Sequence, residues 1–228
     1  MAHFPELEKL GCPRAHFEAV IFDFDGTLAD SMGVWTDIDW LFCKKYNLGV
    51  PDDFRENIIG LGFEGTAEYF INELHVDMTV QECCDEFNRL ALERYQHDVR
   101  LKPGAKEYLD LLDARGVPFT LASSLNRMLL EAALESNGIA GRFARINLCD
   151  ELGTHKNQPY IYLTTAAQLG VAPQDCVVFE DIVPATLSAQ RVGMCTVGVL
   201  DPTDGAQDTP ALQKLADVSI HSYHELLA

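Results

Sequence analysis

The sequence predicts an α/β protein with a doubly wound parallel sheet at its core and a helical unit inserted into it. Short apolar runs recur along the chain, helical patterns lie between them, and the stretch 32–102 contains no convincing strand. Continuous apolar runs are typical of strands buried on both faces, and alternating strands and helices form right-handed βαβ units. We therefore expect a Rossmann-like core of residues 19–31 and 103–228, an α-helical cap of residues 32–102, and an N-terminal extension of residues 1–18.

The strands are expected at the short apolar runs. The first run, 19–22, ends at two aspartates that are separated by a single residue. The later strands are expected at 117–122, 146–148, 176–179 and 195–199, with a weaker edge strand at 218–220.

The helices are expected between these runs, and glycine marks the ends of the core helices. Proline near the first turn and glycine after the last turn are the usual signs of helix ends. In the cap, Trp35, Ile38 and Phe42 lie at helical spacing, and Thr79 with Glu82 has the form of a capping box. The core helices are expected at 103–115, 126–137, 159–169 and 184–192, and the other cap helices at 52–59, 66–74 and 79–95.

Composition and charge narrow the classes of partner. The chain has 228 residues, of which 47% are hydrophobic, and a formal net charge of −18. The apolar content is sufficient for a folded core. The negative charge repels nucleic-acid phosphates and anionic membranes, so we expect neither as a partner. A small anionic substrate remains compatible with this charge, because a bound cation can reverse the local field.

The N-terminal residues and the cysteines favour a cytoplasmic protein. Residues 1–15 mix charged and apolar side chains, without the apolar region of a signal peptide or a membrane-spanning run, so we expect a short surface extension. The chain has seven cysteines, with no C-x-x-C pair and no zinc-ligand spacing with histidine. We expect these thiols to be reduced and mostly buried.

The two aspartates after the first strand, Asp23 and Asp25, are the first candidate site. Ligands of a doubly wound sheet bind at the carboxyl ends of its strands, and residues two apart on an extended segment point the same way. Paired carboxylates suit Mg²⁺, and one can act as a nucleophile while the other transfers protons. Gly26 permits a sharp turn and Thr27 offers a hydroxyl. The alternative for an isolated D-x-D-G sequence is a turn with an aspartate cap.

The segment 22–31, F-D-F-D-G-T-L-A-D-S, resembles the opening motif of the haloacid dehalogenase-like hydrolase superfamily. The motif has the form found in the phosphatase and phosphomutase branch of this superfamily. In this resemblance, the second aspartate, Asp25, favours a phosphate ester as substrate over cleavage of a C–P or C–halogen bond. The resemblance extends over about 19–199 and places the inserted helices where the β-phosphoglucomutase-like members carry a cap. It implies Mg²⁺ as cofactor, Asp23 as nucleophile and metal ligand, and Asp25 as proton donor and metal ligand through its carbonyl.

Three further motifs follow at the ends of later strands. The resemblance implies that Ser123 binds the transferring phosphoryl group, with Ser124, Gly26 and Thr27 also beside the phosphate. It implies that Lys156, before Pro159, holds the phosphoryl oxygens and offsets carboxylate charge. In isolation, the two serines would be read as a helix N-cap and the lysine as a solvated side chain.

The acidic pair Glu180 and Asp181 is the last motif. The resemblance implies that both bind Mg²⁺, with Asp181 as the direct ligand; a plain helix cap is the alternative for Asp181. Ile182 and Ala185 stand where the family commonly has Ser and Gly.

The cap residues favour hydrolysis over isomerisation. In the resemblance, Trp35 stands where β-phosphoglucomutase has a cap histidine, and Phe63 stands near the position of a cap arginine of that mutase. Phe63 and Glu64, in a glycine-flanked loop, are therefore candidate specificity residues, as is Trp35, for which packing in the cap core is the alternative.

The resulting hypothesis is a Mg²⁺-dependent phosphatase that hydrolyses a small phosphorylated metabolite, a sugar phosphate or nucleotide-related ester, through an aspartyl-phosphate. A phosphomutase of the β-phosphoglucomutase type is the first alternative. A non-catalytic protein that binds a phosphorylated ligand on the same fold is the second.

Overall fold

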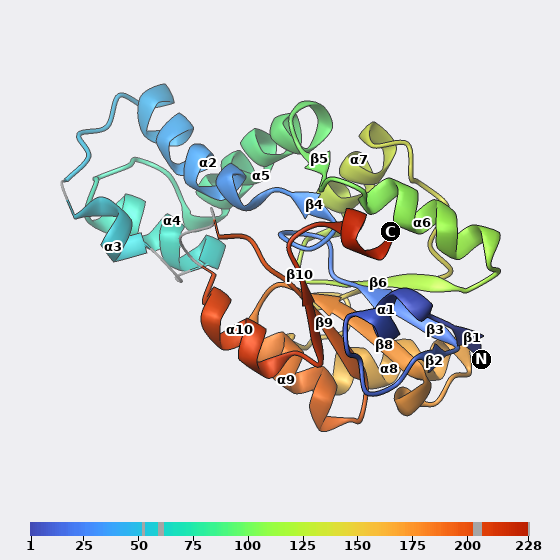
Figure 1. The fold of residues 1–228 in the computed structure, drawn as a ribbon. Helices are drawn as coiled ribbons and strands as arrows, with labels where there is room; N and C mark the ends of the chain where they lie inside the picture. Colours follow the sequence, from blue (N-terminus) through green and yellow to red (C-terminus); the bar gives the residue numbers. More distant parts are fainter. Residues whose placement is uncertain (52, 59–61, 203–206, 228) are drawn as a thin grey trace.

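The computed structural model describes residues 1–228 except 52, 59–61, 203–206 and 228, and it leaves undescribed the side chains of 35, 36, 55, 56, 62 and 63. Its centre is a parallel sheet of six strands in the order β10-β9-β8-β3-β6-β7 (Figure 1). The strands are β3 (Ala19–Phe22), β6 (Phe119–Ser123), β7 (Ile146–Leu148), β8 (Cys176–Glu180), β9 (Cys195–Val199) and β10 (Val218–Ile220). All six predicted strands are confirmed, including the edge position of β10.

Helices cover both faces of the sheet, so the doubly wound α/β fold is confirmed. In β3, Val20 and Phe22 pack on one face, while Ala19 and Ile21 belong to a second core cluster on the other. The first face carries α6 (Ala105–Ala114) and α7 (Arg127–Ser136), as Figure 1 shows above the sheet. The other face carries α8 (Tyr160–Leu169), η1 (Pro173–Asp175), α9 (Val183–Arg191) and α10 (Thr209–Leu215).

The strand order sets the position of the site. From β3 the chain winds outward through β6 to β7, and then returns to β8, which pairs with the opposite side of β3. The change of direction between β3 and β8 is the place where sheets of this class bind their ligands.

The chain leaves and re-enters the core at one short antiparallel ladder. In it, β4 (Ala29–Asp30) pairs with β5 (Arg100–Leu101), and Lys102 N donates to Leu28 O at 2.8 Å. Between these strands lie α2 (Met32–Lys45), α3 (Phe54–Ile58), α4 (Gly62–Asn72) and α5 (Val80–His97), here called the helical insertion. The boundaries that define core and cap as domains stay a prediction.

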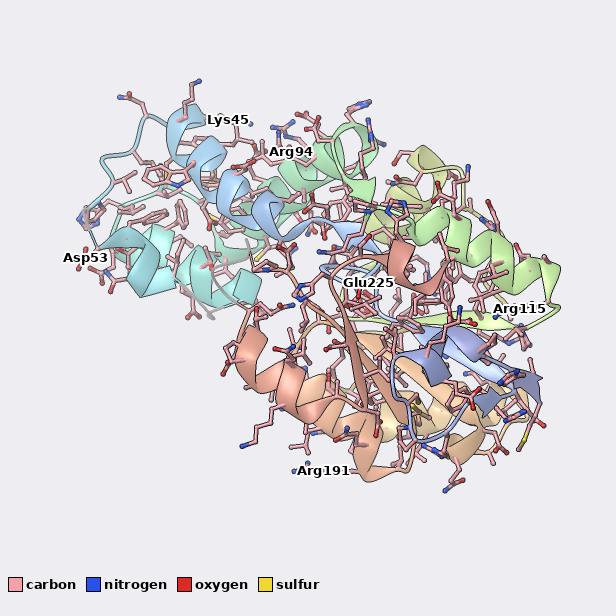
Figure 2. The ribbon with its side chains drawn as sticks, viewed as in Figure 1. Lys45, Asp53, Arg94, Arg115, Arg191 and Glu225 are labelled. Carbon is pink, nitrogen blue, oxygen red and sulfur yellow. The ribbon has the colours of Figure 1, made fainter. Side chains whose placement is uncertain are left out.

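Aromatic packing holds the helical insertion together. Phe42, Phe54, Phe70 and Phe87 are buried, and the ring centroids of Phe42 lie 4.9 Å from both Phe70 and Phe87. The first contact is edge-on and the second is tilted, and such aromatic contacts add to the stabilisation from buried apolar area. Charged side chains such as Lys45 and Arg94 lie on its outside (Figure 2). The expected capping box of α5 is present, because the side chain of Thr79 accepts from Glu82 N and the Glu82 carboxylate accepts from Thr79 N.

Helix α5 also joins the insertion to the core by packing against α7. Asn126 Nδ2, at the start of α7, donates to Asn88 Oδ1 at 2.8 Å, and Ser136 Oγ donates to Tyr95 O at 3.1 Å. These contacts hold α5 against α7 of the core.

The N-terminal residues are more deeply packed than the sequence predicts. Strands β1 (Ala2–His3) and β2 (His16–Phe17) pair around α1 (Pro5–Lys9), and Phe4, Leu7 and Phe17 are fully buried. Glu6 is also buried and pairs with Arg115, labelled in Figure 2, at 2.7 Å. The expectation of a surface extension is wrong for these residues, because their apolar side chains complete one face of the core.

The C-terminal residues end in η2 (Tyr223–Leu226), where Glu225 completes a second capping box with Ser222 (Figure 2). Within the described residues, every helix is too short or too polar to cross a membrane. The seven cysteines are free thiols, and six of them are buried.

Candidate active site

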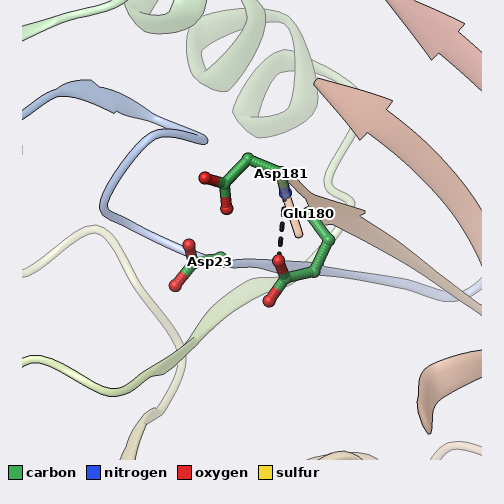
Figure 3. Close-up of side chains that lie close together, drawn as sticks. All are labelled: Asp23, Glu180 and Asp181. Atoms are coloured by element: carbon green, nitrogen blue, oxygen red, sulfur yellow. Dashed lines mark hydrogen bonds between the residues drawn. The ribbon is translucent and has the colours of Figure 1, made fainter. Parts of the chain in front are cut away.

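The polar residues of the site gather at the carboxyl-terminal edge of the sheet. Asp23 directly follows β3, Ser123 ends β6, and Glu180 ends β8 with Asp181 after it. Because the strands are parallel, their ends meet at one edge. Figure 3 shows Asp23, Glu180 and Asp181 converging there, and all three are buried. The sequence analysis correctly predicts that these three acidic residues come together.

Lys156 connects two of the carboxylates. It lies in the loop between β7 and α8, is buried, and forms ion pairs with Asp23 Oδ1 and, at 2.5 Å, with Glu180 Oε1. Burial alone would lower the pKa of Lys156, but the charges of Asp23 and Glu180 outweigh burial and raise it. Lys156 is therefore a fixed positive charge against the carboxylate of Asp23, not a solvated side chain.

Glu180 has hydrogen-bond partners at both oxygens. Oε1 accepts from Lys156 and from the Tyr162 hydroxyl at 3.2 Å, and Oε2 accepts from the backbone N–H groups of Asp181 at 3.0 Å and Ile182 at 3.3 Å. These bonds orient Lys156 and fix the turn that carries Asp181. Tyr162 is a residue of the site that the sequence analysis does not predict.

Asp23, Glu180 and Asp181 form a group whose negative charge exceeds its compensation. Each offers an oxygen within 4.8 Å of the others, and Lys156 supplies one positive charge against three carboxyl groups. Burial, opposed by Lys156, raises the pKa of Asp23 to about 7. Burial and then repulsion from Glu180 and Asp23 raise the pKa of Asp181 well above its usual value.

This cluster fits a hard divalent cation. A buried group of carboxylate oxygens with unrelieved repulsion is the donor set that Mg²⁺ prefers. Thr27 adds to the argument, since its hydroxyl lies 3.3 Å from Asp23 Oδ2 and 3.2 Å from Asp181 Oδ1 but has one hydrogen to donate. The residues present therefore suit a hard divalent metal ion.

Gly26 makes the close approach of the first loop to Asp181 possible. Its φ is +74°, and a Cβ atom there would lie 2.8 Å from Asp181 Cγ. A larger residue would both strain the backbone and displace the carboxylate. The structure thus gives Gly26 a steric reason to be glycine.

The Asp25 carboxylate lies apart from the acidic cluster and has different hydrogen-bond partners. Its Oδ1 accepts from the Ser31 hydroxyl and from the Tyr95 hydroxyl, both at 2.6 Å, and its carboxylate is not part of the acidic cluster. Burial raises the pKa of Asp25, and the bonds from Ser31 and Tyr95 partly oppose this shift. Tyr95 belongs to α5, so the helical insertion supplies a direct partner to this carboxylate.

Ser123 and Ser124 differ in their surroundings. Ser123 is fully buried, and Leu125 N–H donates to its Oγ at 3.0 Å, which leaves the hydroxyl hydrogen to donate elsewhere. Ser124 is exposed, and its hydroxyl donates to Cys149 Sγ at 3.6 Å. Ser123 thus retains a hydroxyl hydrogen at the sheet edge, whereas the hydroxyl hydrogen of Ser124 is directed to Cys149.

Comparison with known proteins agrees with this geometry. The sequence profile described as haloacid dehalogenase-like hydrolase matches residues 20–199. The chain belongs to this hydrolase family. It is 29% identical over 206 residues to the Drosophila melanogaster protein named "Probable pseudouridine-5'-phosphatase", covering 87% of this chain and 89% of the relative. It is also 29% identical over 216 residues to hexitol phosphatase B of Escherichia coli (strain K12), covering 92% and 94%.

The solved structures extend this agreement to the fold. The β-phosphoglucomutase of Clostridium difficile superposes with a TM-score of 0.69 at 20% identity, covering 92% of this chain and 93% of that one. This haloacid dehalogenase-like hydrolase therefore has the β-phosphoglucomutase fold, as the motifs imply.

The structure describes the predicted specificity residues of the hydrolase less completely than its acidic residues. The side chains of Trp35 and Phe63 lie outside the described part of the structure. Residues 62–64 belong to α4, so the expected loop around Phe63 is helical there, and Glu64 is exposed in its first turn. A specificity role for Trp35, Phe63 and Glu64 stays a prediction.

Proposed function

We propose that this haloacid dehalogenase-like hydrolase is a Mg²⁺-dependent phosphatase acting on a small phosphorylated metabolite through an aspartyl-phosphate. The observation that carries the proposal is the pairing of buried Asp23 with buried Lys156, beside an acidic cluster that suits a cation. The names of the relatives, "Probable pseudouridine-5'-phosphatase" and "Hexitol phosphatase B", support a small phosphate ester as substrate. The free thiols support a cytoplasmic location.

Asp23 is the proposed nucleophile. Its Oδ1 is held by Lys156, and its Oδ2 lies near Thr27, so the carboxylate is fixed at the strand end. One of its oxygens attacks phosphorus and forms an acyl phosphate while the ester oxygen leaves. The Lys156 ammonium and the Ser123 hydroxyl are proposed to hold the phosphoryl oxygens, where charge develops in the transition state.

Asp25 is the proposed general acid and base. Because Ser31 and Tyr95 both donate to Oδ1, a proton on Asp25 resides on Oδ2, and its raised pKa favours the protonated form. Oδ2 gives this proton to the leaving alkoxide. It then accepts a proton from the water that attacks the acyl phosphate, which restores Asp23.

Asp23, Asp181 and the backbone carbonyl of Asp25 are proposed to hold Mg²⁺. When bound, the ion neutralises the carboxylates and the phosphate oxygens, which allows an acidic protein to bind an anionic substrate. Glu180, whose oxygens are occupied by four donors, is proposed to position Lys156 and the Asp181 turn.

Phosphate release from a panel of small phosphate monoesters, measured with Mg²⁺ and with a chelator, tests the proposal. We expect Mg²⁺-dependent release without any added bisphosphate. Isomerised product that appears only with a bisphosphate activator would instead support the phosphomutase alternative. Ligand binding without turnover of any ester would support the non-catalytic alternative.

A further inference from the structure

Two buried thiols from distant parts of the chain meet beside the sheet. Cys12 lies in the loop between α1 and β2, and Cys195 is the first residue of β9. Their Sγ atoms are 3.1 Å apart, although 183 positions separate them in the sequence. Both are free and belong to the same core cluster as Phe4 and Leu7. Since a disulfide has an S–S distance of about 2.05 Å, a movement of about 1 Å would bring the sulfurs to bonding distance.

Cys12 differs from the other six thiols in how readily it ionises. The hydrogen bond with Cys195 is the largest cause that lowers the pKa of Cys12 to about 7, against the effect of burial. The same contact raises the pKa of Cys195. Burial raises the pKa of the remaining thiols, Cys43, Cys83, Cys84, Cys149 and Cys176. Because the thiolate is the reactive form, Cys12 is the thiol best suited to meet an oxidant.

Cys12 also has access to solvent while Cys195 has none. Cys12 is 8% exposed and helps to line a hollow of about 550 Å³, whereas Cys195 is 0% exposed. Arg14, in the same loop, donates to Gln174 O at 2.7 Å and to Gly193 O at 3.0 Å, which holds the loop against the core. A small oxidant can therefore approach Cys12 while Cys195 lies directly behind it.

This pair lies away from the candidate active site. Cys195 pairs with Val177, near the beginning of β8, whereas Glu180 ends that strand at the catalytic edge. The N-terminal segment, residues 1–17, lies at the same end of the sheet, where Figure 1 marks the N-terminus. A bond between the two sulfurs would therefore anchor this segment without contacting the site residues.

We propose that Cys12 and Cys195 form an oxidisable dithiol, which hydrogen peroxide converts into a reversible disulfide that fastens the N-terminal segment to the sheet. The Cys12 thiolate attacks one peroxide oxygen, the O–O bond breaks, hydroxide leaves, and Cys12 becomes a sulfenic acid. The Cys195 sulfur then attacks the Cys12 sulfur and displaces its hydroxyl group, which leaves as water with the Cys195 proton. In total, two thiols and one peroxide give one disulfide and two waters, and two electrons pass from sulfur to oxygen.

Peptide mapping of the wild-type protein tests the proposal directly. After treatment with stoichiometric hydrogen peroxide, the protein is unfolded and its thiols are labelled with N-ethylmaleimide. We expect two fewer labels than in the untreated protein, a peptide in which Cys12 is linked to Cys195, and full recovery of labels with dithiothreitol. A Cys12 sulfinic acid without a crosslink, or a crosslink between other cysteines, would overturn the proposal.

Three variants make the test independent of any one substitution. Cys12→Ser and Cys195→Ser should each lose the crosslink, while the matched control Cys84→Ser, on α5, should keep it.

Oxidised wild type should show a higher Tm and slower proteolysis of residues 1–17 than reduced wild type, because the crosslink restricts the unfolded chain. Phosphatase turnover should be unchanged. Equal Tm values for both forms would show that the bond does not fasten the segment and would contradict that part of the proposal.

Discussion

Asp23 and Asp25 are two residues apart in the chain, yet their carboxylates have different partners. Asp23 faces Lys156 and the acidic cluster, all supplied by the core. Asp25 is bonded to Ser31, at the start of the helical insertion, and to Tyr95 on α5. Under the proposed function this difference is a division of labour, in which the core would hold the phosphoryl group and the insertion would influence the proposed proton-transfer group, Asp25.

The largest expected effect is that of Asp23→Asn. An amide cannot act as the nucleophile, so turnover should fall by on the order of a millionfold, as when other enzymes lose their nucleophile. Phosphate release under saturating Mg²⁺ measures this effect, and far-UV circular dichroism serves as the control for folding. If the variant retained substantial activity, Asp23 would not be the nucleophile, and the comparison between the two aspartates would fail.

The substitution Asp25→Asn should separate proton transfer from nucleophilic attack. Loss of the general acid should slow hydrolysis of alkyl phosphates by about a hundredfold to ten-thousandfold. The defect should be much smaller for p-nitrophenyl phosphate, because nitrophenolate leaves without protonation. Transient phosphorylation of the variant by that ester can be followed as a burst of nitrophenolate. An equal defect on both classes of ester would mean that Asp25 does more than transfer protons.

The change Lys156→Met should affect both turnover and stability. Removing one partner of a buried ion pair leaves Asp23 and Glu180 uncompensated, which costs about 3–5 kcal/mol of unfolding free energy. Turnover should fall by about a hundredfold or more through loss of the charge beside the phosphoryl group. Urea denaturation measures the first effect. As a matched control, Lys45→Met removes an ion pair whose lysine is exposed on the helical insertion, and it should leave the free energy of unfolding nearly unchanged.

The smallest effect is expected for Tyr95→Phe, with Tyr69→Phe on α4 as its control. The Tyr95 hydroxyl stabilises the charged form of Asp25, so its loss should raise the pKa of Asp25 further. Asp25 would then stay protonated to higher pH. The alkaline limb of the kcat/KM profile should move upward in pH, with turnover changed by about tenfold or less. An unchanged alkaline limb would show that Tyr95 does not act on the general acid, and a downward shift would show that its hydroxyl favours the protonated form.

Much of the fold was predictable because its signals are local. The six core strands are continuous apolar runs, and parallel pairing brings their ends to one edge, which is why Asp23, Glu180 and Asp181 could be grouped from the sequence. Lys156 could be included only because the order of motifs resembles a known family. A lysine before a helix has no local feature that predicts its burial between two carboxylates.

The contributions of Tyr95 and Tyr162 could not be predicted, because their partners depend on tertiary structure. Tyr95 bonds to a carboxylate 70 positions away, and Tyr162 bonds to Glu180 from a neighbouring helix. The helical spacing of an aromatic residue predicts that its ring is buried, but it does not predict the partner of its hydroxyl. The packing of Phe4 and Leu7 was missed for a similar reason, since the five-residue helix α1 is too short to show a periodic pattern.

The ladder between β4 and β5 has a mechanical consequence for the enzyme. Both passages of the chain between the sheet and the inserted helices run through this ladder, side by side. The two linkers are hydrogen-bonded to each other, so both ends of the insertion are fixed at one place, in addition to the packing of α5 against α7. Asp25 lies four residues before the ladder and is bonded to α5 beyond it, whereas Asp23 has its partners in the core. Any displacement of the inserted helices would therefore alter the surroundings of Asp25, the proposed proton donor, and leave those of Asp23, the proposed nucleophile, unchanged.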